Sequence, residues 1–327
     1  MARYGAATVV LAVGLSAACT PNLKYPAKTA AAPPPIRELW QEPEDLPKRD
    51  LLYGVGGRQG APNPRGRYEY RSEDTRGASP GYNVRDDSGV SWDIKLGEEA
   101  QPEVVTSRLL WAIGYHQPAT YYVPHGWTIT GAPSWLERAA GPQGPARFRR
   151  EPPNQDAVGE WSWYENPFIG TRAYKGLVMA NLILANWDFK TSNNRIYQVK
   201  PPVGDASRLF VVRDLGAALG RETPNILSRL RLRALRGSKN RIDEFEKTGF
   251  VRRVNGNRVE LEYAGMDPAL FENITTADVR WICGLFSRLT DRQWRDAFRA
   301  AGYPEDLSER FIRKIKDKIS QGAALGN

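Results

Sequence analysis

A predicted apolar helix, a polar loop and a predicted strand pair follow one another between residues 172 and 216. Hydrophobic residues recur at helical spacing from Arg172 to Trp187, then return in two short runs, 195–199 and 209–213, which flank a Pro/Gly turn. The loop Asn186–Asn194 reads Asn-Trp-Asp-Phe-Lys-Thr-Ser-Asn-Asn. This order predicts a helix that ends beside a two-stranded hairpin, with acidic, basic and amide side chains collected at the junction.

The junction contains side chains suited to holding a metal ion and phosphate. Asp188 and Asn193 are separated by four residues in the loop, and Asp214 follows the second strand in Arg-Asp-Leu-Gly. Mg²⁺ or Mn²⁺ takes carboxylate and amide oxygens together with phosphate and water, so we expect Asn193 and Asp214 to bind the metal. Asp188 is the candidate to accept the proton of an attacking hydroxyl, and Lys190 the candidate to neutralise phosphate charge. The alternative is that Asp188 and the asparagines only cap a turn.

Upstream, the sequence from about residue 65 to residue 96 predicts three consecutive antiparallel strands with short connections. These strands are Arg67–Arg71, Gly81–Arg85 and Val90–Leu96. A helix is predicted from Glu103 to Tyr115, because apolar residues recur at helical spacing and Gly114 marks its end. A short strand is expected at Tyr121–Val123, before Pro124.

Lys95 lies near the end of the third predicted strand and is the candidate cation for the phosphates of a nucleotide. Glu103, at the start of the next helix, is the preferred partner to orient this lysine, and Glu98 and Glu99 compete for that role. The alternative is a solvated strand lysine, with carboxylates that only complement the positive end of the helix dipole.

A glycine-containing loop is needed to cover the phosphates. We favour Thr75–Gly81, between the first two strands, where the backbone at Gly77 and Gly81 and the hydroxyl of Ser79 could bind phosphate oxygens. The stretch Gly54–Gly60 is richer in glycine but lies far upstream of the strand lysine. A glycine-rich loop alone is a weak signal, and either stretch could be an ordinary turn.

The N-terminus predicts export. Residues 1–18 contain one early positive charge and an apolar stretch that ends in small residues, which is typical of a secretory signal peptide. Leu15–Cys19 resembles the lipid-attachment box of bacterial lipoproteins, so we expect a lipid on Cys19 that anchors the chain to the cell envelope, facing the periplasm or the exterior. Cleavage that leaves a free Cys19 thiol is the alternative. Residues 19–50, rich in Pro and Ala, are expected to form a tether.

Composition limits the other classes of function. The chain has 327 residues, of which 41% are hydrophobic, and this suits a folded globular protein. Part of the net charge of +9 comes from a basic run at 229–241, which could bind an acidic acceptor or anionic headgroups, or could be the solvated face of a helix. Nucleic acid is not an expected partner. Two histidines and no Gly-x-Ser-x-Gly motif disfavour a histidine-rich metal site and a Ser-His-Asp hydrolase. Cys283 is expected to be a buried hydrophobe.

The remaining segments predict local structure more than chemistry. Residues 141–154 are rich in Pro and Arg and are expected to form a loop. The aromatic residues between 161 and 168 could stack on a sugar, but aromatic residues more often pack a loop onto a core. The C-terminal third is expected to be helical, with a capping box at Thr290–Gln293 and a last helix from Glu305 to about Gln321.

These motifs together resemble an atypical protein-kinase-like family, related to secreted and bacterial kinase-like proteins that lack the usual His-Arg-Asp. The resembling segments are Trp92–Lys95, Glu103–Tyr115, Ala185–Asn194 and Val211–Gly216. The resemblance implies an α+β, bilobal fold with an antiparallel-sheet N-lobe at 51–125 and a mainly helical C-lobe at 126–327. It also implies a site for ATP or another nucleotide with Mg²⁺ or Mn²⁺. The chain differs from the usual pattern by Asn-Trp in place of His-Arg and by Leu215 in place of Phe.

A second resemblance covers most of the chain but implies no activity. A group of exported bacterial proteins of unknown function is similar at Lys95–Ala100, Asn166–Phe168 and Asp296–Tyr303. The function expected from the residues is a kinase-like phosphotransferase that phosphorylates a hydroxyl of an envelope protein, lipid or sugar. An exported protein meets little ATP, so a catalytically silent kinase-fold binding module stays an alternative. Nucleotidyl or glycosyl-phosphate transfer on the same fold is a third possibility.

Overall fold

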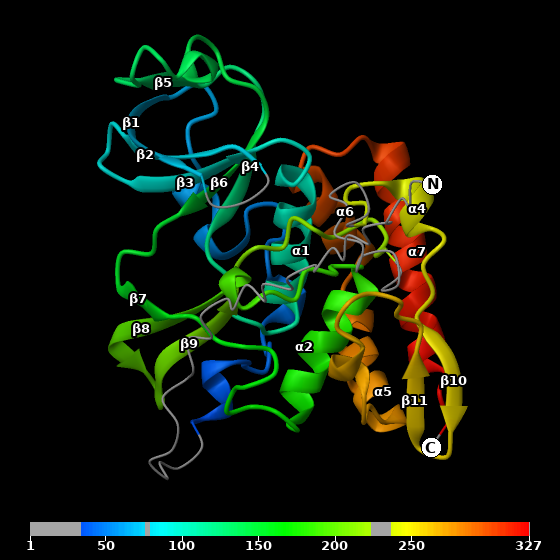
Figure 1. Ribbon diagram of the computed structural model, residues 1–327. Helices are drawn as coiled ribbons and strands as arrows, with labels where there is room; N and C mark the ends of the chain where they lie inside the picture. Colours follow the sequence, from blue (N-terminus) through cyan, green and yellow to red (C-terminus); the bar gives the residue numbers. More distant parts are fainter. Residues whose placement is uncertain (1–33, 76–78, 224–236, 327) are drawn as a thin grey trace, which may run out of the picture. The chain divides into compact units, whose positions relative to one another are not determined.

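The computed structural model describes residues 34–75, 79–223 and 237–326 (Figure 1). All of these described residues belong to one unit by their internal contacts. Within the described ranges, no helix is both long enough and apolar enough to cross a membrane. The expected signal peptide and the lipidation of Cys19 concern residues outside these ranges and stay predictions.

A six-stranded sheet carries the strand lysine. Its strand order is β4-β6-β3-β2-β1-β5, and every neighbouring pair is antiparallel except β1 and β5 (Figure 1). The bounds are Arg67–Asp74 for β1, Gly81–Asp86 for β2, Ser91–Leu96 for β3, Thr120–Val123 for β4, Thr128–Thr130 for β5 and Ala146–Arg150 for β6. The three consecutive antiparallel strands expected from the sequence are confirmed, as is the short strand before Pro124.

The prediction of a loop over residues 141–154 was wrong, because β6 lies inside this range. β6 pairs with β3 on one side and with β4 on the other, so it is an interior strand of the sheet. Two of its three arginines, Arg147 and Arg149, are 1% and 7% exposed, and buried carboxylates neutralise them. Arginine is usually exposed on the protein surface, so its presence here led to the prediction of a loop instead of a buried strand. Because β5 and β6 belong to the sheet, the domain boundary proposed after residue 125 falls within it.

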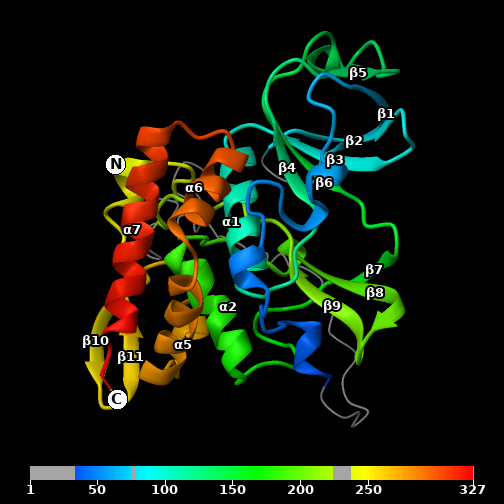
Figure 2. The ribbon, with the colours of Figure 1, turned by 180° about the vertical axis from the view of Figure 1, so that it is seen from behind.

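Helices supply most of the remaining regular structure. Their bounds are Ala100–Ala112 for α1, Arg172–Ile183 for α2, Ile242–Phe245 for α4, Thr276–Ser287 for α5, Asp291–Ala300 for α6 and Glu305–Ala323 for α7. Short 3-10 helices are η1 Ile36–Glu38, η2 Leu46–Lys48, η3 Gly54–Gly56, η4 Arg58–Gly60, η5 Glu137–Ala139, η6 Thr191–Asn193 and η8 Pro268–Phe271. α5 and α7 pack together, and Figure 2 shows them from behind.

Local sequence signals account for several of these helix ends. α1 begins three residues before the expected Glu103, and the chain leaves it at Gly114, whose φ of 100° suits glycine. The capping box that opens α6 is confirmed, because the Thr290 side chain accepts from the Gln293 N–H and Gln293 reciprocates. α2 ends at Ile183, four residues before the expected Trp187.

The expected strand pair after α2 is present and belongs to a three-stranded antiparallel sheet, β7-β8-β9. Its bounds are Gln155–Gly159 for β7, Asn194–Val203 for β8 and Ala206–Val212 for β9, and a separate hairpin consists of β10 Val251–Asn255 and β11 Arg258–Leu261. In the register of β8 and β9, Asn194 lies opposite Val212. The polar loop that precedes β8 and the turn that follows β9 are therefore neighbours.

The tether expected over residues 19–50 does not extend through residues 34–50. Leu39 and Leu46 are 1% and 0% exposed, so this segment contributes to the core. The Trp40 indole N–H donates to the Ile113 carbonyl at 2.7 Å, and the Glu38 carboxylate accepts from the Ser207 hydroxyl at 3.1 Å. Burial of these apolar side chains overcomes the extended tendency of a Pro-rich segment.

Two other expectations about buried residues are confirmed. Cys283 is fully buried, and burial raises the pKa of its thiol to about 12, so the thiol is inert at neutral pH. Trp161, Trp163 and Phe168 are also buried, whereas Tyr164 is 52% exposed, and Trp161 and Trp163 pack with their ring centroids 4.9 Å apart. These three aromatic residues pack a loop onto the core instead of presenting a stacking surface.

Candidate functional site

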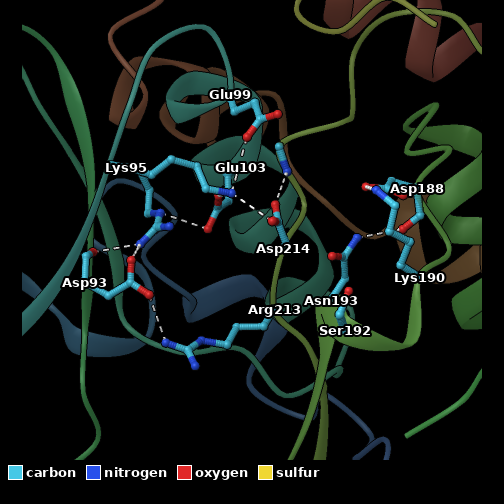
Figure 3. A network of polar contacts seen from close by, with 12 residues as sticks. Asp93, Lys95, Glu99, Glu103, Asp188, Lys190, Ser192, Asn193, Arg213 and Asp214 are labelled. Carbon is cyan, nitrogen blue, oxygen red and sulfur yellow. Dashed lines mark hydrogen bonds and ion pairs between the residues drawn. The ribbon is translucent and has the colours of Figure 1, made fainter. Parts of the chain in front are cut away.

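Lys95, near the end of β3, lies among three carboxylates (Figure 3). Its ammonium nitrogen is 2.8 Å from Asp214, 3.3 Å from Glu99 and 3.5 Å from Glu103, and its side chain is only 14% exposed. Burial works against the charge, but Glu103 and Asp214 outweigh it and raise the pKa of Lys95 above its ordinary value. Lys95 is therefore a fixed positive charge inside the protein.

Two of the three glutamates that compete as partners of Lys95 contact it. Glu103 lies in the first turn of α1, and Glu99 lies four residues earlier at the N-cap, so both reach Lys95 from the same end of the helix. Glu98 instead lies 3.8 Å from Lys239 and is half exposed. Glu103 is the buried partner, at 1% exposure, and Glu99 is the one nearer to solvent, at 12%.

Asp214 follows β9 and faces Lys95. One carboxylate oxygen pairs with the lysine, and the other accepts from the backbone N–H of Gly216 at 3.4 Å. Burial raises the pKa of Asp214, but the Lys95 charge outweighs this and holds the pKa below its usual range. The side chain remains 38% exposed, so Asp214 is an ionised carboxylate that a ligand from solvent can reach.

Asn193 is held next to Asp214 through the backbone. The Asn193 carbonyl accepts from the N–H groups of Arg213 at 2.8 Å and Asp214 at 3.2 Å. Its side-chain nitrogen donates to the backbone carbonyl of Asp188 at 2.9 Å, which ties the two ends of the loop together (Figure 3). Because the amide nitrogen is engaged, the amide oxygen is the atom of Asn193 that suits a metal ion.

The donor set at this junction fits a magnesium ion held jointly with phosphate. In the described part of the chain, no group of three histidine, cysteine, aspartate or glutamate side chains could hold a metal by itself. Asp214 supplies one carboxylate and Asn193 one amide oxygen, and Mg²⁺ commonly takes few protein ligands and completes its shell with phosphate and water. The site therefore suits a metal that arrives with a phosphate ligand.

Asp188 and Lys190 form an ion pair at 2.7 Å within the loop (Figure 3). Asp188 is 20% exposed and Lys190 is 57% exposed, so the lysine belongs to the surface. The predicted role of Lys190 on a phosphate requires that it leave Asp188. A surface pair of this kind is weak, at about 0–1 kcal/mol, so the exchange costs little.

Part of the candidate phosphate loop lies outside the described residues. Gly77 falls in the range that the structure does not describe, while Ser79 and Gly81 are described. Gly81 begins β2 directly opposite Lys95, and a Cβ there would lie 2.7 Å from the carbonyl oxygen of Ile94, so the close approach needs glycine. The predicted roles of these residues toward phosphate stay predictions.

The alternative glycine stretch has a packing role. Gly54–Gly60 forms η3 and η4, and a Cβ at Gly54 would lie 2.1 Å from the Arg108 guanidinium. A Cβ at Gly56 would likewise lie 1.9 Å from the Tyr121 hydroxyl oxygen. These glycines allow a loop to pack closely on α1 and β4, which accounts for them without a phosphate.

Sequence reasoning missed a buried charge network behind Lys95. Asp93 on β3 pairs with Arg147 at 2.8 Å and with Arg213 at 3.1 Å, and Arg149 also contacts it. Glu103 pairs with Arg147 at 2.9 Å and Arg149 at 3.0 Å. The signal that could have revealed this network is the alternation Ala-Arg-Phe-Arg at 146–149, which is strand periodicity with arginine on one face.

Arg149 connects α1 to the strand that leads to Asp214. Besides Glu103, its guanidinium donates to the backbone carbonyl of Arg213 at 3.0 Å. The Arg149 side chain thus positions Glu103 on α1 and also the residue that precedes Asp214. Two of the carboxylates around Lys95 are therefore positioned by this network and do not depend on Lys95 alone: Glu103 directly, and Asp214 through the backbone of Arg213.

Most of the basic run at 229–241 lies outside the described residues, but Lys239 is described. Its ammonium group donates to Glu99 and lies close to Glu98. The run thus contributes a second lysine to the carboxylate cluster, which the sequence did not indicate.

No family model matches the chain, and no curated protein matches it. Among solved structures, the chain is similar to the proinflammatory kinase CtkA of Helicobacter pylori, with a TM-score of 0.46 and 10% sequence identity. The match covers 77% of this chain and 94% of that chain. This likeness does not assign an activity, and the proposals below depend on the residues of this chain.

Proposed function

We propose that the chain is a kinase-like phosphotransferase that binds ATP or another nucleotide with Mg²⁺ or Mn²⁺. One observation carries the proposal: the Lys95 ammonium pairs with Asp214 at 2.8 Å, while the backbone of Asp214 is bonded to that of Asn193. A buried lysine for phosphate thus lies beside a carboxylate and an amide for the metal. This combination provides the charges that phosphoryl transfer requires.

Each residue of the site has a defined task in this proposal. Asp214 and Asn193 hold the metal, which supplies charge neutralisation on the phosphates when it is bound. Lys95, kept in place by Glu103, binds phosphate oxygens that the metal leaves free. Asp188 accepts the proton of the acceptor hydroxyl. The hydroxyl oxygen bonds to the terminal phosphorus, and the bond between that phosphorus and the nucleoside diphosphate breaks.

The acceptor is proposed to be a hydroxyl of an envelope protein, lipid or sugar. This follows from the expected export signal and from the lipid expected on Cys19, which would hold the domain at a membrane surface. The basic run at 229–241 makes an acidic acceptor a reasonable first choice for a screen.

Ligand-induced stabilisation tests the nucleotide site directly. At a concentration 100 times its dissociation constant, a ligand adds about 2.7 kcal/mol to the free energy of unfolding, which raises the melting temperature measurably. We expect such a rise with ATP and Mg²⁺ in the wild type and none in Asp214→Asn. Asp205→Asn is the matched control, because this exposed carboxylate lies on the surface and pairs with the exposed Arg37 at 3.5 Å. No rise in the wild type with ATP, ADP or GTP, with Mg²⁺ or Mn²⁺, contradicts the proposal.

The second candidate is a catalytically silent binding module, and one observation favours it. Asp188 is already paired with Lys190, and Asp214 with Lys95, so the acidic groups of the site are neutralised from within the chain. The two candidates differ at Asp188. In an enzyme, Asp188→Asn keeps nucleotide binding and loses phosphoryl transfer, whereas a silent module binds ligand without transfer in the wild type as well.

A further inference from the structure

We propose that Lys239 is a second phosphate-binding lysine, which contacts the terminal phosphate of a nucleoside triphosphate, and that Glu99 takes the place of this phosphate in the free protein. The inference rests on the proposed nucleotide site. It adds to that site a residue that discriminates triphosphate from diphosphate.

The geometry of Glu99 is the first support. One of its carboxylate oxygens accepts from Lys239, and the other lies 3.3 Å from the ammonium of Lys95. The side chains of Lys95, Glu99 and Lys239 are 14%, 12% and 19% exposed, so all three are largely withdrawn from water. An anionic group bridging two lysines in this way can be replaced by a phosphate group, whose oxygens accept the same charge-assisted hydrogen bonds.

Glu99 lies against the turn that carries the candidate metal ligand. A Cβ on Gly216 would lie 2.6 Å from the Cβ of Glu99, so the glutamate rests on the turn from Asp214 to Gly216. The backbone N–H of Gly216 donates to Asp214 in the same turn. A phosphate between the two lysines would therefore lie next to the residue proposed to hold its metal ion.

Lys239 is held by its neighbours on both sides. Ser238 exchanges two backbone hydrogen bonds with Arg221, at 2.8 and 3.2 Å, and its carbonyl also accepts from the Trp187 indole at 3.0 Å. Asn240 donates from its side chain to Gln101 at 3.1 Å, on the first turn of α1. The backbone of Lys239 is thus fixed beside α1, which is how a binding residue is preorganised.

The charge of Glu99 makes it a competitor of phosphate for the two lysines. Burial raises the pKa of Glu99, but Lys95 and Lys239 outweigh it and lower the pKa, so Glu99 is an anion at neutral pH. Lys95 also has Glu103 and Asp214 as partners, and Lys239 has Glu98 at 3.8 Å. Both lysines therefore keep a carboxylate partner when Glu99 turns away. Bound triphosphate would then displace an anion instead of entering an empty cationic site.

The test compares the affinities of triphosphate and diphosphate by calorimetry on the full chain. The ligands are ATP and ADP, each with Mg²⁺, and the variants are Lys239→Met and the control Lys247→Met. Lys247 is a half-exposed lysine that pairs with Glu244 at 2.6 Å on the surface. We expect Lys239→Met to weaken ATP binding by about ten- to hundredfold, the size of one charge-assisted hydrogen bond, and to change ADP binding little. Lys247→Met should match the wild type for both ligands.

The outcomes separate this inference from the function on which it rests. If the wild type binds neither nucleotide, the proposed nucleotide site is wrong. If the wild type binds both and Lys239→Met keeps the wild-type ratio of ATP to ADP affinity, the role of Lys239 is wrong and the site stands. Should Lys239→Met not fold, Glu99→Gln decides the question. Removing the competing charge should tighten ATP binding, and unchanged or weaker binding overturns the inference.

Discussion

The substitution Glu103→Gln tests how far the charge network behind Lys95 supports the fold. Glu103 is 1% exposed and pairs with Arg147 at 2.9 Å, with Arg149 at 3.0 Å and with Lys95 at 3.5 Å. Glutamine keeps the size of the side chain and one acceptor oxygen but removes the negative charge. The buried cations Lys95, Arg147 and Arg149 then lose one of their shared anions. The carboxylates that remain near them are those of Asp93, Glu99 and Asp214.

The expected cost follows from the burial of the pairs. Breaking a buried ion pair from one side costs about 3–5 kcal/mol, because the remaining charge stays buried without compensation. Glutamine can still accept a hydrogen bond, so we expect a value near the lower end, about 3 kcal/mol. This is a large share of the roughly 5–15 kcal/mol by which a domain is stable.

Urea unfolding followed by circular dichroism measures this cost. With an m-value of about 3 kcal/mol per molar urea, the unfolding midpoint should fall by about 1 M. Glu98→Gln is the matched control, because Glu98 is 52% exposed and forms a long ion pair with Lys239, at 3.8 Å. Losing a surface pair of this kind should cost about 0–1 kcal/mol. If the two variants lose the same stability, the network is not a stabilising core element and the reasoning fails.

Three further predictions concern pH and packing. The lowered pKa of Asp214 stabilises the folded state above its unfolded pKa of about 4, so stability should fall as pH drops below about 4, and less steeply in Asp214→Asn; equal slopes in urea titrations would contradict this. Burial lowers the pKa of Lys318 to about 7, so above that pH the folded state has released a proton that the unfolded state keeps until about 10. Stability should therefore rise between pH 7 and about 9 in the wild type, and a rise of equal size in Lys318→Met would refute the assignment. Gly216→Ala places a methyl group 2.6 Å from the Cβ of Glu99 and should cost about 1–3 kcal/mol in thermal unfolding, whereas Gly159→Ala, with nothing near its added Cβ, should cost far less.

Local patterns predicted much of the backbone. Alternation of apolar residues located β2 and β3, and helical spacing located α1, because both periods depend on the face that each element buries. The capping box of α6 was readable because its two partners are three residues apart. β6 was missed because its buried arginines are neutralised by distant residues, which no local pattern records.

The sequence by itself determined which residue types are available to the candidate site and on which kinds of element they lie. It indicated Lys95 at a strand end, Glu103 on the next helix and Asp214 after a hairpin. Only the tertiary structure decided that Lys95 and Asp214, 119 residues apart, form a direct pair, and that Lys239 meets Glu99 across 140 residues. Such partners depend on how strands are ordered and how helices pack. Ion pairs form wherever packing brings opposite charges together out of water, whatever their separation along the chain.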